Sequence, residues 1–524
     1  MYTQLLVHDV APFTTRLASW ATVIFIGFLF YRAFLGPLSH LPGPLLAKFT
    51  GQWRSLRYWR GRWHEDILEV HRQYGPIVRI APNEVAVVDQ KALKLLYGHG
   101  HNAAKTDWYG SWDPAVGPPA FFAVRDRKLH STLRKRVSGA YTMSAILKYE
   151  LHIQDCLDLF LRKLQKHSAA GSKIDMSNWT NAFAFDVVGE LVYGAPLGHL
   201  ESETDVSGLR KSIFNIFFWS ANLGHYWGQK SLYYNKYSLA VRKLLGSKNS
   251  ITAFREWSIS RVKKRWDMRE TVPSPRNDML SHFLHMKNPN GQGVRFDEVL
   301  GEAMNIIGAG ADTTSIAMRA CLFAVCSRAD VYQKLQKEVD DFYKANKLSR
   351  PIQYLETQKL PYLCAVTKEA MRLFPSIVFQ LLRFAPEGGI CVDGKTVPAG
   401  TPIGISPVAQ NRDPLVWGDN ADDFLPERWL EGEERTRYLD SNNMTFGGSG
   451  PRMCVGKNIA LVEIHKFLAQ ILRHFDVEIA DKEKSWHVTS YWFAYQHDFN
   501  VHVRVRAQNP LLSKEKPTEI AVAA

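Results

Sequence analysis

Residues 446–456 read FGGSGPRMCVG. Glycines and a proline surround one arginine and one cysteine, and a helical pattern, NIALVEIHKFLAQILR, follows at 458–473. Glycines let a backbone pass close to a flat ligand. Backbone N–H groups and the positive end of the following helix stabilise a thiolate. A single thiolate with no other cysteine or histidine nearby suits an iron that a macrocycle already holds, because such an iron needs one axial protein ligand.

Other interpretations of the loop stay open at this point. A phosphate-binding loop needs G-x-x-x-x-G-K-[ST], but the interval from Gly450 to Gly456 is one residue too long, and Asn458 stands where Ser or Thr belongs. A dinucleotide-binding G-x-G-x-x-G would need its third glycine at Met453. A structural cysteine buried in a turn is the plainest alternative to a metal-binding thiolate at Cys454.

The stretch resembles the haem-binding loop F-x-x-G-x-R-x-C-x-G of the cytochrome P450 family. The glycines and the arginine of that pattern fall in register around Cys454, which the resemblance makes the axial ligand of the haem iron. Phe446 lies eight residues before the cysteine, whereas the family places it seven before. We expect a bulge within 447–449 to absorb the extra residue. The resemblance assigns Phe446, Gly450 and Arg452 to cofactor binding.

A second motif, KEAMR at 368–372, places Glu369 and Arg372 three residues apart on one face of a predicted helix. Alone, such a pair is common on protein surfaces and contributes little. FLPERW follows at 424–429. The resemblance implies that Arg428 joins the pair in a buried three-way network that supports the cysteine loop.

A third motif, AGADTT at 309–314, lies inside a long helical pattern. Gly308 and Gly310 each cost up to about 1 kcal/mol relative to alanine, so the helix needs space there. A threonine at this place can bond back to the carbonyl four residues earlier. A seam of small residues against another helix explains the glycines equally well. The resemblance assigns Asp312 and Thr313 to proton delivery toward bound dioxygen.

A fourth motif, RDRKLHSTLRKRV at 125–137, places His130 and Arg134 one helical turn apart. The resemblance assigns both to the haem propionates, together with Arg452 and with Arg383, which follows Arg372 by eleven residues.

The N-terminal region predicts a membrane anchor. Residues 17–31, LASWATVIFIGFLFY, carry no charge, and the apolar stretch is near the lower limit for a bilayer-spanning helix. Basic residues follow it, which puts the bulk of the chain on the cytosolic side: Arg32, Lys48, Arg54, Arg57, Arg60 and Arg62. We expect a short luminal N-terminus at 1–16, a transmembrane anchor at 17–35, a proline-rich linker at 36–50, a catalytic domain at 51–507 and a flexible tail at 508–524.

The body of the chain predicts a mainly α fold with small β-sheets, preceded by that single helix. Helical periodicity marks 64–74, 142–166, 178–193, 297–326, 329–346 and 361–374, and short strand patterns mark 76–80, 84–88, 396–404 and 499–506. The net charge of +14 and the pI of about 9.3 suggest an acidic partner. No zinc-finger spacing and no long basic run occurs, so we expect no nucleic-acid partner.

The resemblance implies a membrane-anchored monooxygenase of the endoplasmic reticulum that faces the cytosol. Its cofactor would be haem b, with electrons from NADPH through NADPH–cytochrome P450 reductase and a possible contribution from cytochrome b5. Finer similarity points to fungal secondary-metabolism members of the pisatin-demethylase-like group, on KTDWYGSW at 105–112, RNDMLSHFL at 276–284 and MCVGKNIA at 453–460.

Aromatic residues gather at 108–122, 214–227 and 491–495, which favours an apolar small-molecule substrate. Two other functions compete with a monooxygenase: a reductase-independent haem-thiolate isomerase or dehydratase, and a non-catalytic haem-binding sensor.

Overall fold

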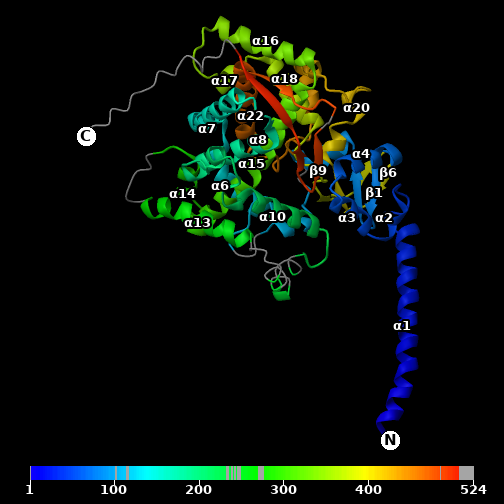
Figure 1. Cartoon of the computed structure of the whole chain (residues 1–524). Helices are drawn as coiled ribbons and strands as arrows, with labels where there is room; N and C mark the ends of the chain where they lie inside the picture. The colour runs from blue at the N-terminus through cyan, green and yellow to red at the C-terminus, as the bar shows by residue number, and fades with distance from the viewer. Residues whose placement is uncertain are drawn as a thin grey trace.

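The computed structural model describes residues 2–506, except for residues 101–102, 114–116, 230, 232–234, 238–239, 241–243, 245–249, 270–275 and 484–485. Most of the chain forms one helical body with a smaller β-rich part beside it, and α1 (Tyr2–Phe34) projects away from both (Figure 1). The tail expected at 508–524 lies outside the described residues.

The centre of the helical body is α15 (Phe296–Cys326), which packs against α8 (Met176–Tyr193), α18 (Pro361–Leu373) and α22 (Lys457–His474). Apolar side chains surround α15 on nearly every face, which is typical of a helix in the core of a large domain. The other long helices around this core are α6 (Arg127–Ser138), α7 (Met143–Ala169), α10 (Leu209–Leu223), α13 (Ser250–Met268) and α16 (Ala329–Ala345).

Short helices fill the remaining surface. The α-helices among them are α2 (Leu45–Phe49), α3 (Gln52–Trp59), α4 (Trp63–Tyr74), α5 (Gln90–Tyr97), α9 (His199–Ser202), α14 (Met279–Leu284), α17 (Tyr354–Thr357), α19 (Pro407–Gln410), α20 (Pro414–Trp417) and α21 (Glu433–Asn442). The 3₁₀ turns are η1 (Asp107–Trp112), η2 (Gly139–Tyr141), η3 (Val206–Gly208) and η4 (Pro426–Trp429).

The largest sheet has the order β1-β2-β7-β4 and forms a second apolar core with the helices around it. Strands β1 (Ile77–Ala81) and β2 (Glu84–Val87) pair antiparallel, β2 pairs parallel with β7 (Pro402–Gly404), and β4 (Arg383–Phe384) pairs antiparallel with β7. The smaller sheets are β3-β11-β8, β9-β10 and β5-β6, formed by β3 (Ile174–Asp175), β5 (Ile390–Val392), β6 (Lys395–Val397), β8 (Phe475–Ile479), β9 (His487–Ser490), β10 (Ala494–His497) and β11 (Asn500–Val505).

The predicted elements agree with the structure to within a few residues, with one exception. The strand pattern at 396–404 is two strands in two different sheets, β6 and β7. Pro398 and Gly400, whose φ is +78°, separate them, because this sequence turns the chain where a single strand would have to continue. The fold class is therefore the predicted one, mainly α with small sheets.

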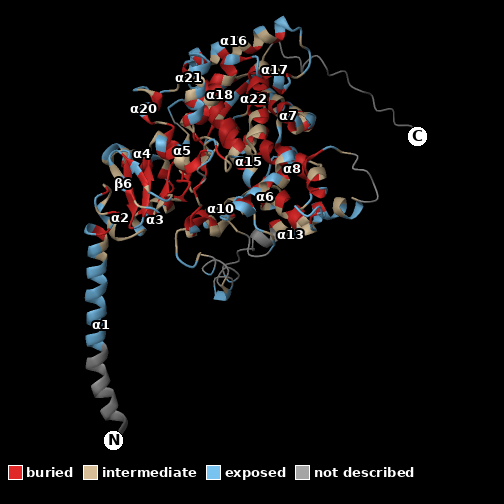
Figure 2. Cartoon of the chain, turned by 180° about the vertical axis from the view of Figure 1, so that it is seen from behind, coloured by how far each residue is buried: buried red, intermediate tan, exposed pale blue. Residues whose placement is uncertain are grey.

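The one helix in the described residues that is long and apolar enough to cross a membrane is α1, over Thr15–Phe34. Its mean hydropathy is 1.6, and its side chains in this part are almost all exposed, in contrast to the buried interior of the body (Figure 2). An exposed apolar stretch of this size marks a surface for membrane or protein contact.

The segment expected to be a linker, 36–50, folds onto the body. Leu38, Leu41 and Ala47 are buried, and Leu45–Phe49 forms α2. The buried Arg79 of β1 explains the attachment, because its guanidinium donates hydrogen bonds to the carbonyls of Arg32 (3.0 Å), Ala33 (3.2 Å) and Leu38 (3.3 Å). The last carbonyls of a helix have no partner within the helix, so Arg79 caps the end of α1 and ties it to the sheet.

Candidate functional site

The cysteine loop turns through the predicted bulge. Gly447 and Gly448 have φ values of +80° and +86°, a conformation that glycine adopts without steric cost. The N–H of Cys454 donates a hydrogen bond of 2.9 Å to the carbonyl of Phe446, so the ends of the loop stay paired despite the extra residue. Phe446 is half-buried, and the Lys457 ammonium lies 5.5 Å from the centre of its ring.

The Cys454 thiol lies at the start of α22, where the backbone N–H groups of Gly456 and Lys457 point at the sulfur. Burial raises its pKa, and these N–H groups and the charges of Arg134 and Lys457 oppose that rise. The side chain is nevertheless accessible by surface area. The sulfur can be surrounded by protein and still be accessible when it faces an interior space. A cysteine that binds a cofactor needs such a position.

Gly450 is fixed by close packing against α5. A Cβ at this position would overlap the carbonyl of Tyr97, so a larger residue would displace the loop. Tyr97 in turn is held firmly, because its hydroxyl donates to the carbonyl of Leu381 (2.6 Å) and accepts from the N–H of Ile405 (3.0 Å). The loop is therefore positioned by the sheet part of the molecule as well as by α22.

The middle of α15 has an accessible stripe within an otherwise buried helix. Ala309 is exposed and Thr313 is half-buried, and the Thr313 hydroxyl donates a 2.7 Å hydrogen bond to the carbonyl of Ala309. The helix stays continuous there. The two glycines serve packing: a Cβ at Gly308 would lie 3.1 Å from Phe217, and one at Gly310 would lie 3.3 Å from Val188.

Asp312 faces away from that stripe. Its buried carboxylate accepts hydrogen bonds from the Asn181 amide of α8 (2.8 Å) and the Tyr495 hydroxyl of β10 (3.1 Å). Burial raises the pKa of Asp312, although these two bonds and the nearby Arg319 act in the opposite direction. No direct hydrogen bond joins Asp312 to Thr313 among the described contacts, because successive positions of an α-helix point about 100° apart.

The predicted propionate ligands lie within electrostatic range of one another. His130 is buried, and burial together with Arg452, Arg134 and Arg383 lowers its pKa to about 3. Arg383 is also buried, donates to the Tyr109 hydroxyl at 2.7 Å and leaves its Nε without a partner. In the part of the chain that the structure describes, no carboxylate pairs with His130, Arg134 or Arg383.

Lys105 belongs to the same cluster, and sequence analysis missed it. It pairs with Arg383 through a β-bridge, is buried, and places its ammonium 4.3 Å from the ring centre of Tyr109. Burial, Arg383, Arg452 and Arg134 hold its pKa well below the usual range. The spacing between Lys105 and the motif at 125–137 follows no known pattern, so only the folded structure shows that Lys105 lies with the predicted propionate ligands.

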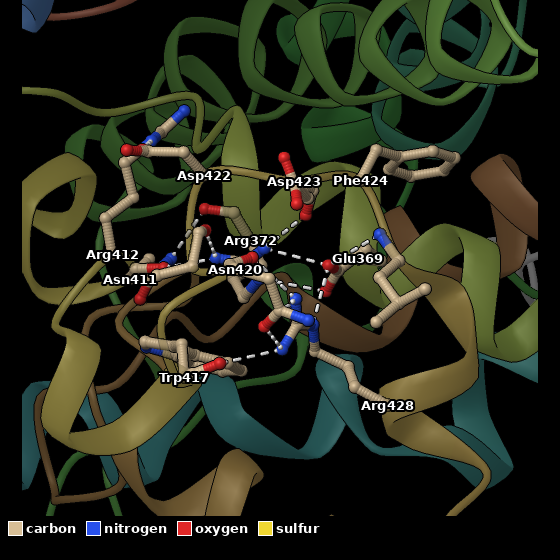
Figure 3. Close-up of polar contacts among 12 residues, drawn as sticks. Glu369, Arg372, Asn411, Arg412, Trp417, Asn420, Asp422, Asp423, Phe424 and Arg428 are labelled. Carbon is tan, nitrogen blue, oxygen red and sulfur yellow. Dashed lines mark hydrogen bonds and ion pairs between the residues drawn. The ribbon is translucent and has the colours of Figure 1, made fainter.

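Glu369, Arg372 and Arg428 meet in one buried network (Figure 3). The Glu369 carboxylate accepts two hydrogen bonds from Arg372 and one from Arg428, each 2.8 Å long. The three residues are 0%, 0% and 2% exposed. Burial by itself raises the pKa of Glu369, but the hydrogen bonds and charges of Arg372 and Arg428 outweigh it and the net shift is downward.

Asn411 connects this network to the cysteine loop and was also missed from sequence. Its side chain donates to the carbonyl of Arg372 (3.1 Å) and accepts from the N–H of Met444 (2.8 Å), two residues before Phe446. Its amide also lies 3.3 Å from the Thr445 hydroxyl. A lone asparagine in a loop has no sequence pattern that could have revealed this role.

The three aromatic stretches converge in space. The Trp492 ring lies 4.9 Å from that of Trp108 and 5.3 Å from that of Trp112, and Phe217 lies 5.3 Å from Trp112 and 5.1 Å from Phe493. Phe217 also packs on Gly308 of α15, so the aromatic cluster reaches the helix that carries Thr313.

Comparison with known proteins decides what this constellation is. The sequence model of the Cytochrome P450 family matches residues 41–494. This chain belongs to the cytochrome P450 family.

Similar P450s are fungal. Cytochrome P450 monooxygenase cicH of Emericella nidulans is 34% identical over 484 residues, which cover 90% of this chain and 94% of that protein. Cytochrome P450 monooxygenase gsfF of Penicillium aethiopicum is 34% identical over 494 residues, 92% of this chain and 96% of that protein. Pisatin demethylase of Fusarium vanettenii is 30% identical over 493 residues, 91% of this chain and 92% of that protein. The chain is accordingly a haem-thiolate P450 monooxygenase.

The residues present fit haem. A haem group offers an iron, a flat ring and two carboxylates. The chain offers an accessible thiol, small residues in the cysteine loop and on α15, and the basic side chains of Lys105, His130, Arg134 and Arg383, for which the described contacts include no carboxylate. The unpartnered Nε of buried Arg383 is a donor that needs an acceptor from outside the chain.

Proposed function

We propose that this P450 is a membrane-anchored monooxygenase of fungal secondary metabolism, which hydroxylates, demethylates or epoxidises an apolar small molecule with electrons from a reductase. The observation that carries the proposal is the arrangement of the accessible Cys454 thiol, the exposed Ala309 stripe of α15 and an aromatic cluster that reaches the same helix.

In this proposal Cys454 would ligate the iron, and the carboxylates of the haem would be held by Lys105, His130, Arg134, Arg383 and Arg452. A haem bound through a thiolate activates dioxygen and favours cleavage of its O–O bond. The chain supports the sulfur with the N–H groups of Gly456 and Lys457, which stabilise its anionic form without proton transfer.

Thr313 and Asp312 divide the handling of protons. The Thr313 hydroxyl, held at the carbonyl of Ala309, offers a hydrogen-bond group at the accessible stripe. Asp312 holds a proton more readily than an ordinary aspartate and stands between Asn181 and Tyr495 on the far side of α15. Transfer between the two therefore requires a mediating water. Thr313→Ala should uncouple NADPH consumption from product formation more than it lowers consumption itself.

The reductase would dock on α6 and the start of α22. Arg127, Lys128 and Lys135 are exposed on α6, whereas Arg136 is turned inward to pair with Glu298 at 2.6 Å. Lys135→Glu should slow reductase-driven turnover and leave peroxide-driven turnover unchanged, while Lys344→Glu, at the end of α16, should change neither. Equal loss in both reactions would contradict this docking surface. If cytochrome b5 also donates electrons at this surface, Lys135→Glu should slow turnover that depends on cytochrome b5 as well.

The exposed apolar part of α1 supports a single-pass anchor in the endoplasmic reticulum, with the body on the cytosolic side. Carbonate extraction of microsomes should leave the chain in the pellet, and removal of residues 1–34 should release it if α1 is the anchor. Protection of the body from added protease in sealed microsomes would contradict the orientation.

The decisive experiment is the carbon-monoxide difference spectrum of reduced microsomes that contain the chain. We expect the spectrum of a thiolate-ligated haem for the wild type and its loss in Cys454→Ser. An unchanged spectrum in the variant would refute the assignment. Strict dependence of product formation on NADPH and reductase separates this function from an isomerase or dehydratase, which needs neither, and from a sensor, which forms no product.

A further inference from the structure

A group of potential metal ligands lies away from the haem-binding residues, between α7 and α8, which lie side by side (Figure 1). His152 and Asp155 are three residues apart on α7 and therefore share one face of that helix. Glu190 faces them from α8, and the nitrogen and oxygen ligand atoms of the three side chains all lie within 4.8 Å of one another. The closest measured pair is His152 Nδ1 and Glu190 Oε1, at 3.8 Å.

The second observation is the state of the Glu190 carboxylate. Glu190 is 7% exposed, and its Oε2 is buried without a hydrogen-bond partner, whereas its Oε1 pairs with the Arg276 guanidinium. A buried carboxylate oxygen without a partner costs free energy that a suitable ligand would recover. Arg276 holds Oε1, which is also the oxygen nearest to His152, so an ion beside His152 and Asp155 would either share Oε1 with Arg276 or take the unpartnered Oε2.

We propose that His152, Asp155 and Glu190 bind a divalent transition-metal ion, with zinc as the best match. Zinc binds both imidazole nitrogens and carboxylate oxygens, and open zinc sites have three protein ligands, with water in the fourth position of the tetrahedron. Magnesium and calcium prefer oxygen ligands alone and more of them, so a set with imidazole selects against both.

The geometry allows the site to close around an ion. Bonds of about 2.0–2.1 Å to zinc bring tetrahedral ligand atoms to roughly 3.3 Å from one another, so the present separations need to shrink by about 1.5 Å at most. Asp155 is exposed and His152 is only partly buried, so both side chains have room to rotate and the ion has a route of entry. Glu190 is the fixed member, because it is buried and held by Arg276.

Arg276 also lies beside a second carboxylate, that of Asp278, which Arg265 shares. Its Nε lies 3.4 Å from Asp278 Oδ2, while its Nη2 holds Glu190. Groups that hydrogen-bond a ligating carboxylate commonly orient it in metal sites, and Arg276 would do this for Glu190. The bound ion would cross-link α7 to α8, the helix whose Asn181 holds Asp312.

The test is a zinc titration of the haem-loaded full-length chain in detergent, by competition with a fluorescent zinc indicator in chelator-treated buffer. We expect one zinc equivalent whose affinity falls at least tenfold in His152→Gln and in Asp155→Asn, two accessible positions that do not threaten folding. Glu190→Gln should lose the same equivalent. Excess magnesium should not displace it.

His167→Gln is the matched control, because His167 lies on the same helix and pairs with a single carboxylate, Glu203, at 3.1 Å. It should leave the affinity within about twofold of the wild type. Equal affinity in His152→Gln and the wild type, equal loss in His167→Gln, or displacement by magnesium would each overturn the proposal. The readout is zinc binding at constant haem content, so its failure is separate from a failure of the proposed monooxygenase function.

Discussion

Replacing Glu369 by glutamine keeps the shape of the side chain and removes its charge. Glu369 Oε1 accepts hydrogen bonds from Arg372, Arg428 and the N–H of Leu425, and Oε2 accepts from Arg372 and the Trp429 indole. A glutamine NH₂ group in either position therefore faces at least two donors. No rotation of the amide avoids this conflict.

The magnitude follows from the burial of the network. The wild-type cluster of Glu369, Arg372 and Arg428 carries a net charge of +1, and the variant would bury +2 at sites that are almost fully inaccessible. Removing one partner of a buried ion pair costs about 3–5 kcal/mol. Because whole domains are stable by only about 5–15 kcal/mol, Glu369→Gln should leave little folded, haem-loaded protein.

The assay compares haem content per protein and the thermal unfolding midpoint of the full-length chain with a neighbouring control. Glu427→Gln removes a carboxylate one position from Arg428, where the wild type pairs with Lys334 at 2.7 Å on the surface. An exposed pair of this kind contributes about 0–1 kcal/mol. If Glu369→Gln matched Glu427→Gln in midpoint and haem content, the network would not be stabilising the cysteine loop.

Three further substitutions test the site. Lys105→Met removes a buried amino group whose charged form burial and its cationic neighbours disfavour, so it should raise the unfolding midpoint of the haem-free protein and speed haem loss to apomyoglobin; a lower midpoint together with slower haem loss would contradict the role. Asn411→Ala should speed haem loss more than it lowers the midpoint of the apoprotein, because it releases Met444; equal effects would indicate a general packing role. Burial raises the pKa of Glu302 from 4.5 to about 7 against the opposing charge of Arg136, so the unfolded chain loses this proton first and stability should fall by about 3 kcal/mol as pH rises from about 4.5 to 7. When the free energy of unfolding is measured with denaturant at both pH values, it should change less with pH in Glu302→Gln than in the wild type. An equal change with pH in both proteins would contradict this assignment.

Local sequence patterns predicted several long helices, the strands β1, β2 and β11 and the family, because apolar periodicity and motif spacing act over short stretches of chain; they did not predict the strands β3, β4, β5, β8, β9 and β10 or the helices α10 and α13. The same patterns did not predict that Asp312 and Thr313 face different directions, and they did not predict the hydrogen-bond partners of Asp312. Sequence neighbours on a helix face different directions, and Asn181 and Tyr495 reach Asp312 from elements more than 100 residues away on either side. Whether the two act as one relay is thus a question of tertiary structure.

The N-terminal boundary shows a second limit of sequence patterns. Prolines and the absence of a helical period at 36–44 predicted a spacer, but the decisive residue, Arg79, lies in a strand far along the chain. A helix end left with unpaired carbonyls seeks donors, and one buried arginine supplies them. The end of α1 is consequently fixed to the sheet, so any tilt of α1 in a bilayer would be passed to the body.

Arginine has opposite uses in the two buried clusters of this P450, and the difference lies in the acceptors. Arg372 and Arg428 share the carboxylate of Glu369 and complete their hydrogen bonds with backbone carbonyls, so they need nothing from outside the chain. Arg383 donates to a hydroxyl and to carbonyls, keeps an unpartnered Nε, and lies beside the buried Lys105. A buried cation without an anion is costly to maintain. The first cluster therefore stabilises the cysteine loop by itself. The second cluster keeps a positive charge without a negative partner, which the carboxylates of a haem would supply, so haem binding and folding are energetically linked.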